Sequence, residues 1–301
     1  MGSDEWRAIN WKQVQKIVYR LQTRIFKAKR RGDTKQVHRL QKLLMKSRSA
    51  KLLAVRRVTQ DNAGKKTAGV DGIKSLSPSQ RLSMASSLAL TGKSQPTRRV
   101  MIPKPGIKDE ERPLGIPCLV DRARQTLAKL ALEPEWEAVF EPNTYGFRCG
   151  RGAHDAIEAI FNGIRCKDKY VLDADIQKCF DKINHSALLN KLNTFPTLHR
   201  QIKAWLKSGM VLEGKLFPTE EGSPQGGVIS PLLALVALQG LETAIRGCVK
   251  PGRNAQRELT VAFYADDFVV LHKSLNVVLK AKLVIEEWLS GMSLELKPSK
   301  T

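Results

Sequence analysis

The N-terminal part of the chain combines apolar and basic positions at helical spacing. Apolar residues recur every three to four positions between Val14 and Ile25, and lysines and arginines lie between them. Gly32 and Asp33 interrupt this pattern, and a second helical pattern runs from Val37 to Val58. The pattern therefore predicts a basic amphipathic helix followed by a second helix, which together form an N-terminal extension.

The middle of the chain alternates between strand and helix patterns. Residues 59–75 are rich in Gly, Thr, Asn and Lys, which is typical of a loop. We expect a strand over 98–102, a turn, and a returning strand over 112–117 that carries basic groups near its tip. The periodicity then predicts helices over 121–140 and 153–164.

Acidic residues occur inside two otherwise apolar strand patterns. Residues 170–176 predict one strand, in which period-two alternation puts Asp173 and Asp175 on the same face. Residues 259–271 predict two strands around a tight turn that holds Asp266 and Asp267. Because the flanks of this turn are apolar on both faces, we expect the hairpin to belong to a buried sheet.

Composition favours a globular chain with a polyanionic partner. The 301 residues are 42% hydrophobic, and 51 Lys and Arg against 29 Asp and Glu give a net charge of +22. Residues 1–60 alone hold 17 basic residues and three acids. An ordinary solvated basic surface is the alternative to a nucleic-acid-binding one, and the one-sided distribution favours RNA binding. On the proposed face are Lys12, Lys16, Arg20, Arg24, Lys27, Lys29, Arg30 and Arg31.

The remaining composition excludes several other classes. Five widely spaced cysteines form no Cys-x-x-Cys pair, which argues against a disulfide framework or a zinc site and fits a reducing compartment. The longest apolar stretch is far shorter than the roughly 18 residues that a membrane span needs. We therefore expect no membrane partner and a reducing compartment such as the cytoplasm.

Adjacent carboxylates at a buried hairpin tip need a counter-ion. Two such charges about 4 Å apart repel by roughly 4 kcal/mol at intermediate dielectric. Mg²⁺ prefers hard oxygen ligands and leaves room for substrate phosphates, and pairs of such ions support nucleotidyl transfer. Taken alone, however, Asp266 and Asp267 would more often form an ordinary solvated turn.

Several motifs together resemble the reverse transcriptases, and among them the proteins encoded by bacterial and organellar group II introns. The resemblance runs over most of the chain. The hairpin 264–267 is similar to the catalytic hairpin of that family, and 175–185 resembles its other metal-binding strand and helix. Ser223-Pro-Gln-Gly-Gly227 resembles the loop beside the incoming nucleotide and template, 145–157 fits a further family segment, and 65–72 resembles the loop before the fingers.

The resemblance implies roles for individual residues. Asp175, Asp266 and Asp267 would hold two Mg²⁺ ions together with Ile176, whereas Asp173 and Asp181 would be structural. Phe180 would abut the sugar of the incoming nucleotide and exclude a 2′-hydroxyl, which favours deoxynucleotides; the alternative is a core aromatic. The further residues that the resemblance assigns to nucleotide binding are Lys104, Arg112, Gln225 and Lys300.

The fold implied by the resemblance is α+β, with right-hand polymerase fingers and palm. Residues 1–58 would form the basic helical extension, 59–165 mainly the fingers with part of the palm helices, and 166–301 mainly the palm, with an antiparallel sheet backed by helices. No pattern for a helical thumb follows, so we expect the thumb to be absent and processive synthesis to be poor.

Three functions stay open at this point. The first is an RNA-directed DNA polymerase of the group II intron type, whose partners are intron RNA template, DNA primer and deoxynucleoside triphosphates, and whose parent protein assists splicing and mobility. The second is an RNA-binding maturase with little polymerase activity, and the third is a bacterial reverse transcriptase outside introns. Each of these functions leaves open whether the chain forms a homodimer. The resemblance implies a location in the bacterial cytoplasm or an organellar matrix.

Overall fold

The structure, a computed structural model, describes residues 2–103, 111–250 and 252–298. By its internal contacts the chain divides into two compact units: Met1–Val139 with Leu192–Ser230, and Phe140–Lys191 with Pro231–Thr301. Both units mix helices with a small sheet, as expected for an α+β chain. Among the described residues, no helix combines the length and apolarity that crossing a membrane would need.

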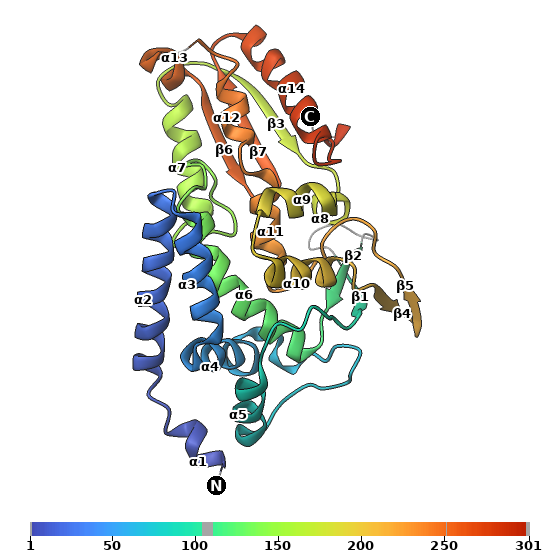
Figure 1. Cartoon of the computed structure of the whole chain (residues 1–301). Coiled ribbons are helices and arrows are strands. Elements are labelled where there is room, and N and C mark those ends of the chain that lie inside the picture. Colours follow the sequence, from blue (N-terminus) through green and yellow to red (C-terminus); the bar gives the residue numbers. More distant parts are fainter. Residues whose placement is uncertain (1, 104–110, 251, 299–301) are drawn as a thin grey trace. The chain divides into compact units, whose positions relative to one another are not determined.

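The first unit is mainly a helical bundle. Helix α2 (Trp11–Arg30) packs on α3 (Thr34–Lys46), α4 (Arg48–Arg56) and α6 (Leu119–Glu137), and these helices lie side by side in Figure 1. Its buried face carries Val14, Val18, Ile25 and Ala28, as the periodicity predicted. Shorter elements complete the bundle: α1 (Gly2–Arg7), a π-helical turn (Arg57–Asp61), a 3₁₀ turn (Ala63–Lys66), α5 (Pro78–Ser87) and α10 (Pro196–Leu206).

The prediction of a single helix through 37–58 was wrong. Ser47 is extended, with φ −63° and ψ 128°, and its N–H caps the carbonyls of Leu43 and Leu44 at the end of α3. Apolar residues are buried on both sides of this break, for example Leu44 and Leu52, so the hydrophobic pattern continues across it. Periodicity therefore could not reveal the change of direction at Ser47.

The sheet of the first unit has the strand order β2-β1-β4-β5. The expected hairpin is confirmed: β1 (Thr97–Pro103) pairs antiparallel with β2 (Glu111–Ile116). The sequence analysis missed β4 (Met210–Leu212) and β5 (Lys215–Phe217), two three-residue strands joined by a tight turn. Strands this short leave too few alternating positions to be recognised from the sequence.

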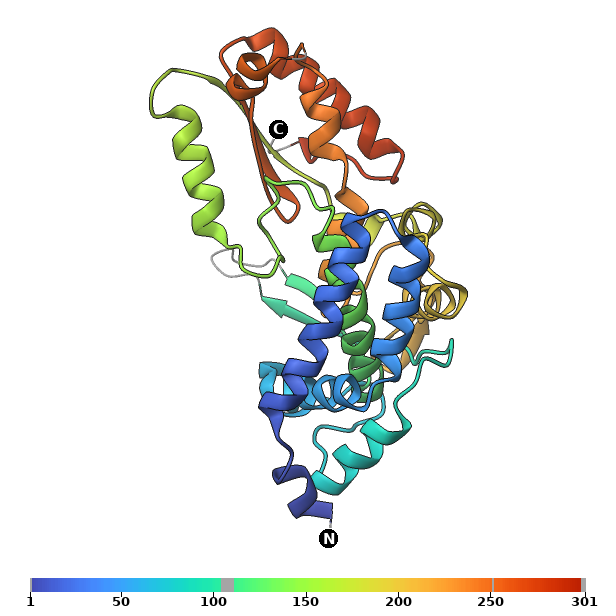
Figure 2. The ribbon, with the colours of Figure 1, turned by 60° about the vertical axis from the view of Figure 1, so that its left-hand side comes forward.

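The second unit is built on an antiparallel sheet of order β3-β7-β6. Both predictions for this region are confirmed, because β3 spans Tyr170–Asp175 and the hairpin consists of β6 (Thr260–Tyr264) and β7 (Asp267–His272). The predicted helix α7 (Ala153–Ile164) packs on β6, and α14 (Leu275–Ser290) packs on β3 and β7. Figure 2 shows these two helices on opposite sides of the sheet. The other helices are α8 (Cys179–Lys182), α9 (His185–Leu192), α11 (Ser230–Leu238), α12 (Leu241–Arg246) and α13 (Arg253–Glu258).

Candidate functional site

Three acidic residues lie close together along the backbone where β3 ends and β7 begins. In the antiparallel register, Asp175 is the direct partner of Asp267. Directly opposite residues point to the same face, with Cβ atoms about 4.5–5.5 Å apart. Asp266 lies in the two-residue turn just before Asp267, and its carbonyl accepts a hydrogen bond of 3.2 Å from the N–H of Ile176. The backbone therefore brings together four residues that the sequence placed in two distant segments.

The turn between the strands has a strained backbone. Tyr264 pairs with Asp267, which leaves Ala265 and Asp266 as the only turn residues between them. Ala265 has φ 59°, a left-handed conformation that favours glycine in hairpin turns. Such strain persists only where the surroundings impose it, and it is found preferentially at functional sites.

The carboxylates create a concentrated negative field. Like charges directly opposite in a sheet are destabilising, and Lys297 offsets part of this repulsion with its Nζ 4.0 Å from Oδ2 of Asp175. Burial raises the pKa of the Cys179 thiol, and the charges of Asp266, Asp175 and Asp181 raise it further. Asp175 and Asp266 therefore both lie near enough to Cys179 for their charges to act on its thiol.

The acids form an incomplete ligand set. Within the described part of the chain, no group of three His, Cys, Asp or Glu side chains is arranged as a metal site by itself. Asp175, Asp266 and Asp267 are nevertheless only partly buried or exposed, and all three offer hard oxygens. Mg²⁺ is usually held in this way, by one or two carboxylates with water and substrate phosphates completing its shell. The donor set fits this ion.

Phe180 lies beside the carboxylates, in the four-residue helix α8. The helix follows Lys178, which has the left-handed φ of 47°. The ring of Phe180 is partly buried and meets the ring of Phe147 edge to face, with centroids 6.0 Å apart. Both rings line one small depression together with Ala265 and Asp266. Phe180 is therefore at the edge of the candidate site rather than deep in the core.

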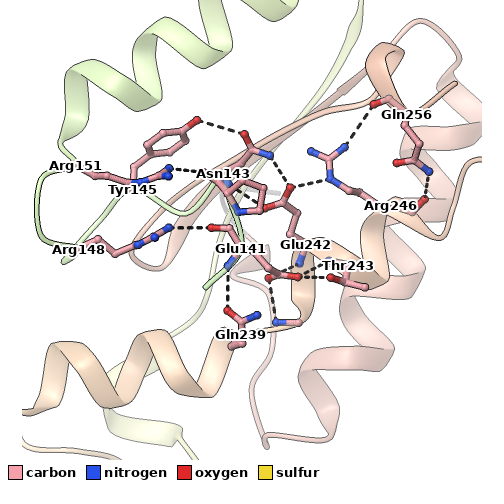
Figure 3. Close-up of polar contacts among 12 residues, drawn as sticks. Glu141, Asn143, Tyr145, Arg148, Arg151, Gln239, Glu242, Thr243, Arg246 and Gln256 are labelled. Atoms are coloured by element: carbon pink, nitrogen blue, oxygen red, sulfur yellow. Dashed lines mark hydrogen bonds and ion pairs between the residues drawn. The ribbon is translucent and has the colours of Figure 1, made fainter. Parts of the chain in front are cut away.

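A polar network holds the segment that leads to Phe147, and Figure 3 shows its members. The Glu141 carboxylate caps the start of α12 by accepting hydrogen bonds from Gly240, Glu242 and Thr243. Arg148 donates back to the carbonyls of Glu141 and Thr144 at 2.9 and 3.0 Å. These contacts fix the loop at both ends.

The same loop packs directly against the turn that holds Ala265 and Asp266. The N–H of Tyr145 donates to the carbonyl of Phe263 at 2.9 Å. At Gly146 the backbones come so close that an added Cβ would lie 2.3 Å from the nitrogen of Ala265. Only glycine fits at this position without displacing the turn.

The predicted nucleotide-binding residues of the first unit lie on β2 and the loop 223–227. Gly115 donates its N–H to the carbonyl of Gln225 at 2.6 Å, and a Cβ on Gly226 would lie 2.7 Å from the carbonyl oxygen of Gly115. Gln125 holds the far end of the loop by accepting from the N–H of Val228 at 2.8 Å. Arg112 is exposed on β2, three residues before Gly115. Lys104 and Lys300 lie outside the described residues.

The basic face of α2 is exposed, with one exception. The side chains of Lys12, Lys16, Arg20, Arg24, Lys27, Arg30 and Arg31 are exposed to solvent. Lys29 instead points inward, with its Nζ 2.8 Å from Oε1 of the buried Glu135. Its charge is thus neutralised within the unit, whereas the others remain available to an anion.

The basic surface extends onto α3, from which no residue was named among the RNA-binding candidates predicted from the sequence. A hollow of about 660 Å³ is lined by Arg24 of α2 and by residues of α3, and an adjoining hollow of about 420 Å³ lies between α2 and the end of α3. The exposed faces of α3 could have been recognised from its own helical periodicity. The basic residues that α3 contributes are Lys35, Arg39, Lys42 and Lys46.

Comparison with known proteins identifies the family. Residues 6–88 match the model of the N-terminal domain of reverse transcriptase, and residues 102–301 match that of reverse transcriptase (RNA-dependent DNA polymerase). A solved telomerase structure from Candida albicans, in complex with a fragment of telomeric RNA, shares the fold with a TM-score of 0.50 at 11% identity. The match covers 70% of this chain and 42% of that one.

Several curated proteins are similar in sequence. Protein YkfC of Escherichia coli K12 is 32% identical over 81% of this chain and 73% of its own length. Group II intron-encoded protein LtrA of Lactococcus lactis is 37% identical over 49% of this chain and 25% of its own length. Maturase-like protein 1 of Euglena gracilis is 30% identical over 80% of this chain and 53% of its own length. The chain therefore belongs to the reverse transcriptase family, and its relatives include group II intron-encoded proteins and maturase-like proteins.

Proposed function

We propose that the chain is an RNA-directed DNA polymerase of the group II intron type, with Asp175, Asp266 and Asp267 as its catalytic residues. The observation that carries the proposal is the cross-strand pairing of Asp175 with Asp267 beside the strained turn at Ala265. Two carboxylates held opposite each other on a rigid sheet cost stability, and a cation-dependent reaction explains why they are there.

The family uses divalent metal ions, and we propose two Mg²⁺ ions for this chain. The ligands would be the carboxylates of Asp175, Asp266 and Asp267 and the carbonyl of Ile176. Bound there, the ions would activate the primer hydroxyl and neutralise charge on the transferred phosphate. The hydrogen bond from Ile176 to Asp266 keeps the ends of the two strands together, so the ligands are preorganised by the backbone.

For nucleotide binding we propose Phe180 as the ring that meets the sugar. Arg112 would contact the triphosphate, because its guanidinium is exposed and suits phosphate oxygens. Gln225 would contact the nucleotide from a loop that Gly115 and Gln125 hold in place. Lys104 and Lys300 are proposed on the resemblance alone.

The domain assignment is part of the same proposal. We assign 1–58 to the basic extension, 59–165 mainly to the fingers and 166–301 mainly to the palm.

A second function, RNA binding for splicing, is favoured by the exposed cations of α2 and α3. Arg20 and Arg24 of α2 and the four basic residues of α3 line two adjoining hollows of the first unit, and phosphate contacts by Lys and Arg provide most of the affinity for RNA backbones. We propose that intron RNA binds here. The template RNA, the DNA primer and deoxynucleoside triphosphates would be the partners of the polymerase site.

The polymerase proposal is tested by incorporation of dATP opposite uridine on a primed RNA template with Mg²⁺. Asp266→Ala should lower the rate by about a thousandfold, because a lost metal ligand removes several kcal/mol of transition-state stabilisation. The matched control is Asp173→Asn, an exposed acid on β3, the strand that also carries Asp175, which should keep nearly full activity. Equal rates in wild type and Asp266→Ala would refute the polymerase proposal.

The two functions give different outcomes in parallel RNA-binding measurements. If neither wild type nor Asp266→Ala incorporates a nucleotide while both bind intron RNA in a salt-dependent way, the maturase function is the one supported. Incorporation by wild type without such binding would remove the RNA-binding proposal instead.

A further inference from the structure

Phe147 is an exposed aromatic residue in an uncommon backbone conformation. Its φ is 60°, in the left-handed region that bulky side chains rarely adopt. Its side chain is 47% exposed, so core packing does not account for the ring being there. Strained residues of this kind are retained where the surrounding structure holds them in place, and they occur preferentially at functional sites.

The backbone on both sides of Phe147 is fixed. Before it, Tyr145 is hydrogen-bonded to Phe263 and Gly146 is in close contact with Ala265. After it, the buried side chain of Arg148 donates to two carbonyls of the same loop. The position of the Phe147 ring is therefore tied to the turn that carries Asp266, not to a flexible loop.

Phe180, in contrast, stands on an element with little support of its own. Helix α8 has four residues, a single turn, and starts from the left-handed Lys178, whose carbonyl accepts hydrogen bonds from the N–H groups of Asp181 and Lys182. The ring of Phe147 meets that of Phe180 edge to face at 6.0 Å, with an interplanar angle of 78°. Contacts of this geometry are favourable for aromatic pairs. Phe147 thus limits how far the Phe180 ring can turn away from the depression that both line.

We propose that Phe147 is a positioning residue that fixes the Phe180 ring and so sets the discrimination between deoxyribonucleotides and ribonucleotides. This inference rests on the proposed function, in which Phe180 excludes the 2′-hydroxyl. Without Phe147, the Phe180 ring gains freedom to move aside, and a ribose can enter where only a deoxyribose fitted. The reaction with deoxynucleotides is then affected much less.

The test compares dATP with ATP on an RNA template that presents uridine. In Phe147→Ala the ratio of the two kcat/KM values should fall by about two- to tenfold, the range expected for loss of one aromatic pair. The kcat for dATP should stay near wild type. Phe147→Tyr keeps the ring and should restore the ratio. Phe161→Ala removes an exposed aromatic from α7 of the same unit, and it should leave the ratio unchanged.

A double-mutant cycle shows whether Phe147 acts through Phe180. In a Phe180→Ala background, Phe147→Ala should cause no further loss of discrimination. An unchanged ratio in Phe147→Ala, or an equal loss in the Phe180→Ala background, would overturn the inference while leaving the polymerase proposal intact.

Equilibrium binding separates this inference from the activity of the chain. With a dideoxy-terminated primer, the ratio of the Kd values for ATP and dATP should fall in Phe147→Ala as in the kinetic test. If wild type incorporates no nucleotide but binds dATP more tightly than ATP in a Phe147-dependent way, the polymerase proposal fails and the positioning role stands. If neither nucleotide binds, both fall.

Discussion

Gly146 provides a sharp test of how the candidate site is held together. Replacing it by alanine puts a Cβ 2.3 Å from the nitrogen of Ala265, whereas ordinary contacts begin at 3.4 Å. To reach an ordinary contact the two backbone segments must separate by 3.4 − 2.3 = 1.1 Å. The atoms that the new Cβ would meet belong to the main chain and cannot rotate away as a side chain could. Over-packing of this kind destabilises a protein by about 1–3 kcal/mol.

The displacement would fall on the turn that holds Asp266 and leads into Asp267, two of the proposed catalytic residues. A misplacement of about 1 Å in a catalytic group can cost roughly a hundredfold in rate. We therefore expect Gly146→Ala to lower the rate of dATP incorporation by about a hundredfold while far-UV circular dichroism remains that of a folded chain.

The matched control is Gly291→Ala, at the end of α14. Gly291 has φ −63°, and a Cβ there would meet its nearest neighbour, the carbonyl oxygen of Trp288, at 3.4 Å. This variant should incorporate dATP at the wild-type rate. If Gly146→Ala did the same and unfolded at the same denaturant concentration, the close approach of the loop to the turn would be wrong.

Two further predictions follow from charges. Lys16→Gln combined with Arg20→Gln should reduce the salt slope of RNA binding by about 0.7 for each lost phosphate contact. The control is Lys280→Gln, which removes an exposed lysine on α14 and should leave the salt slope unchanged. An equal effect of all three substitutions would indicate that RNA binding depends on net charge alone. Burial lowers the pKa of Lys191 from 10.5 to about 8, against the opposing effect of Glu141. Below pH 8 the ammonium of Lys191 is charged in both the folded and the unfolded chain. Between about pH 8 and 10.5 the unfolded chain binds more protons than the folded chain, so this group makes the free energy of unfolding rise with pH. Denaturant unfolding at a series of pH values should show this rise in wild type relative to Lys191→Met, and identical pH profiles would contradict it.

Local patterns were sufficient for the strands that carry the candidate acidic residues, although they did not reveal β4 and β5. Alternation over 170–176 and the apolar flanks of the turn at 265–266 predicted β3, β6 and β7, since strand periodicity depends only on near neighbours. Several motifs together, among them the one around Asp266 and Asp267, indicated the family, which the comparisons confirm. Each of these features depends on residues that are close together in the sequence, so it could be predicted without knowledge of the fold.

Longer-range features were decided only by the tertiary structure. The sequence placed Asp175 and Asp267 in separate strands, and only the sheet made them direct partners. The sequence put Lys29 on the RNA-binding face, whereas packing of α2 on α6 turns it to Glu135. Contacts of this kind join residues about a hundred positions apart, and periodicity carries no information on which elements become neighbours.

The support around the site also depended on packing. Nothing in the local pattern shows that Gly146 must lie against the backbone of Ala265, or that the ring of Phe147 meets that of Phe180. The sequence by itself determined which acidic residues are the catalytic candidates and in which strand or turn each of them lies. Their register, and the loop that holds the turn, were decided by the tertiary structure, because close main-chain approach and ring contact arise only once distant segments are packed together.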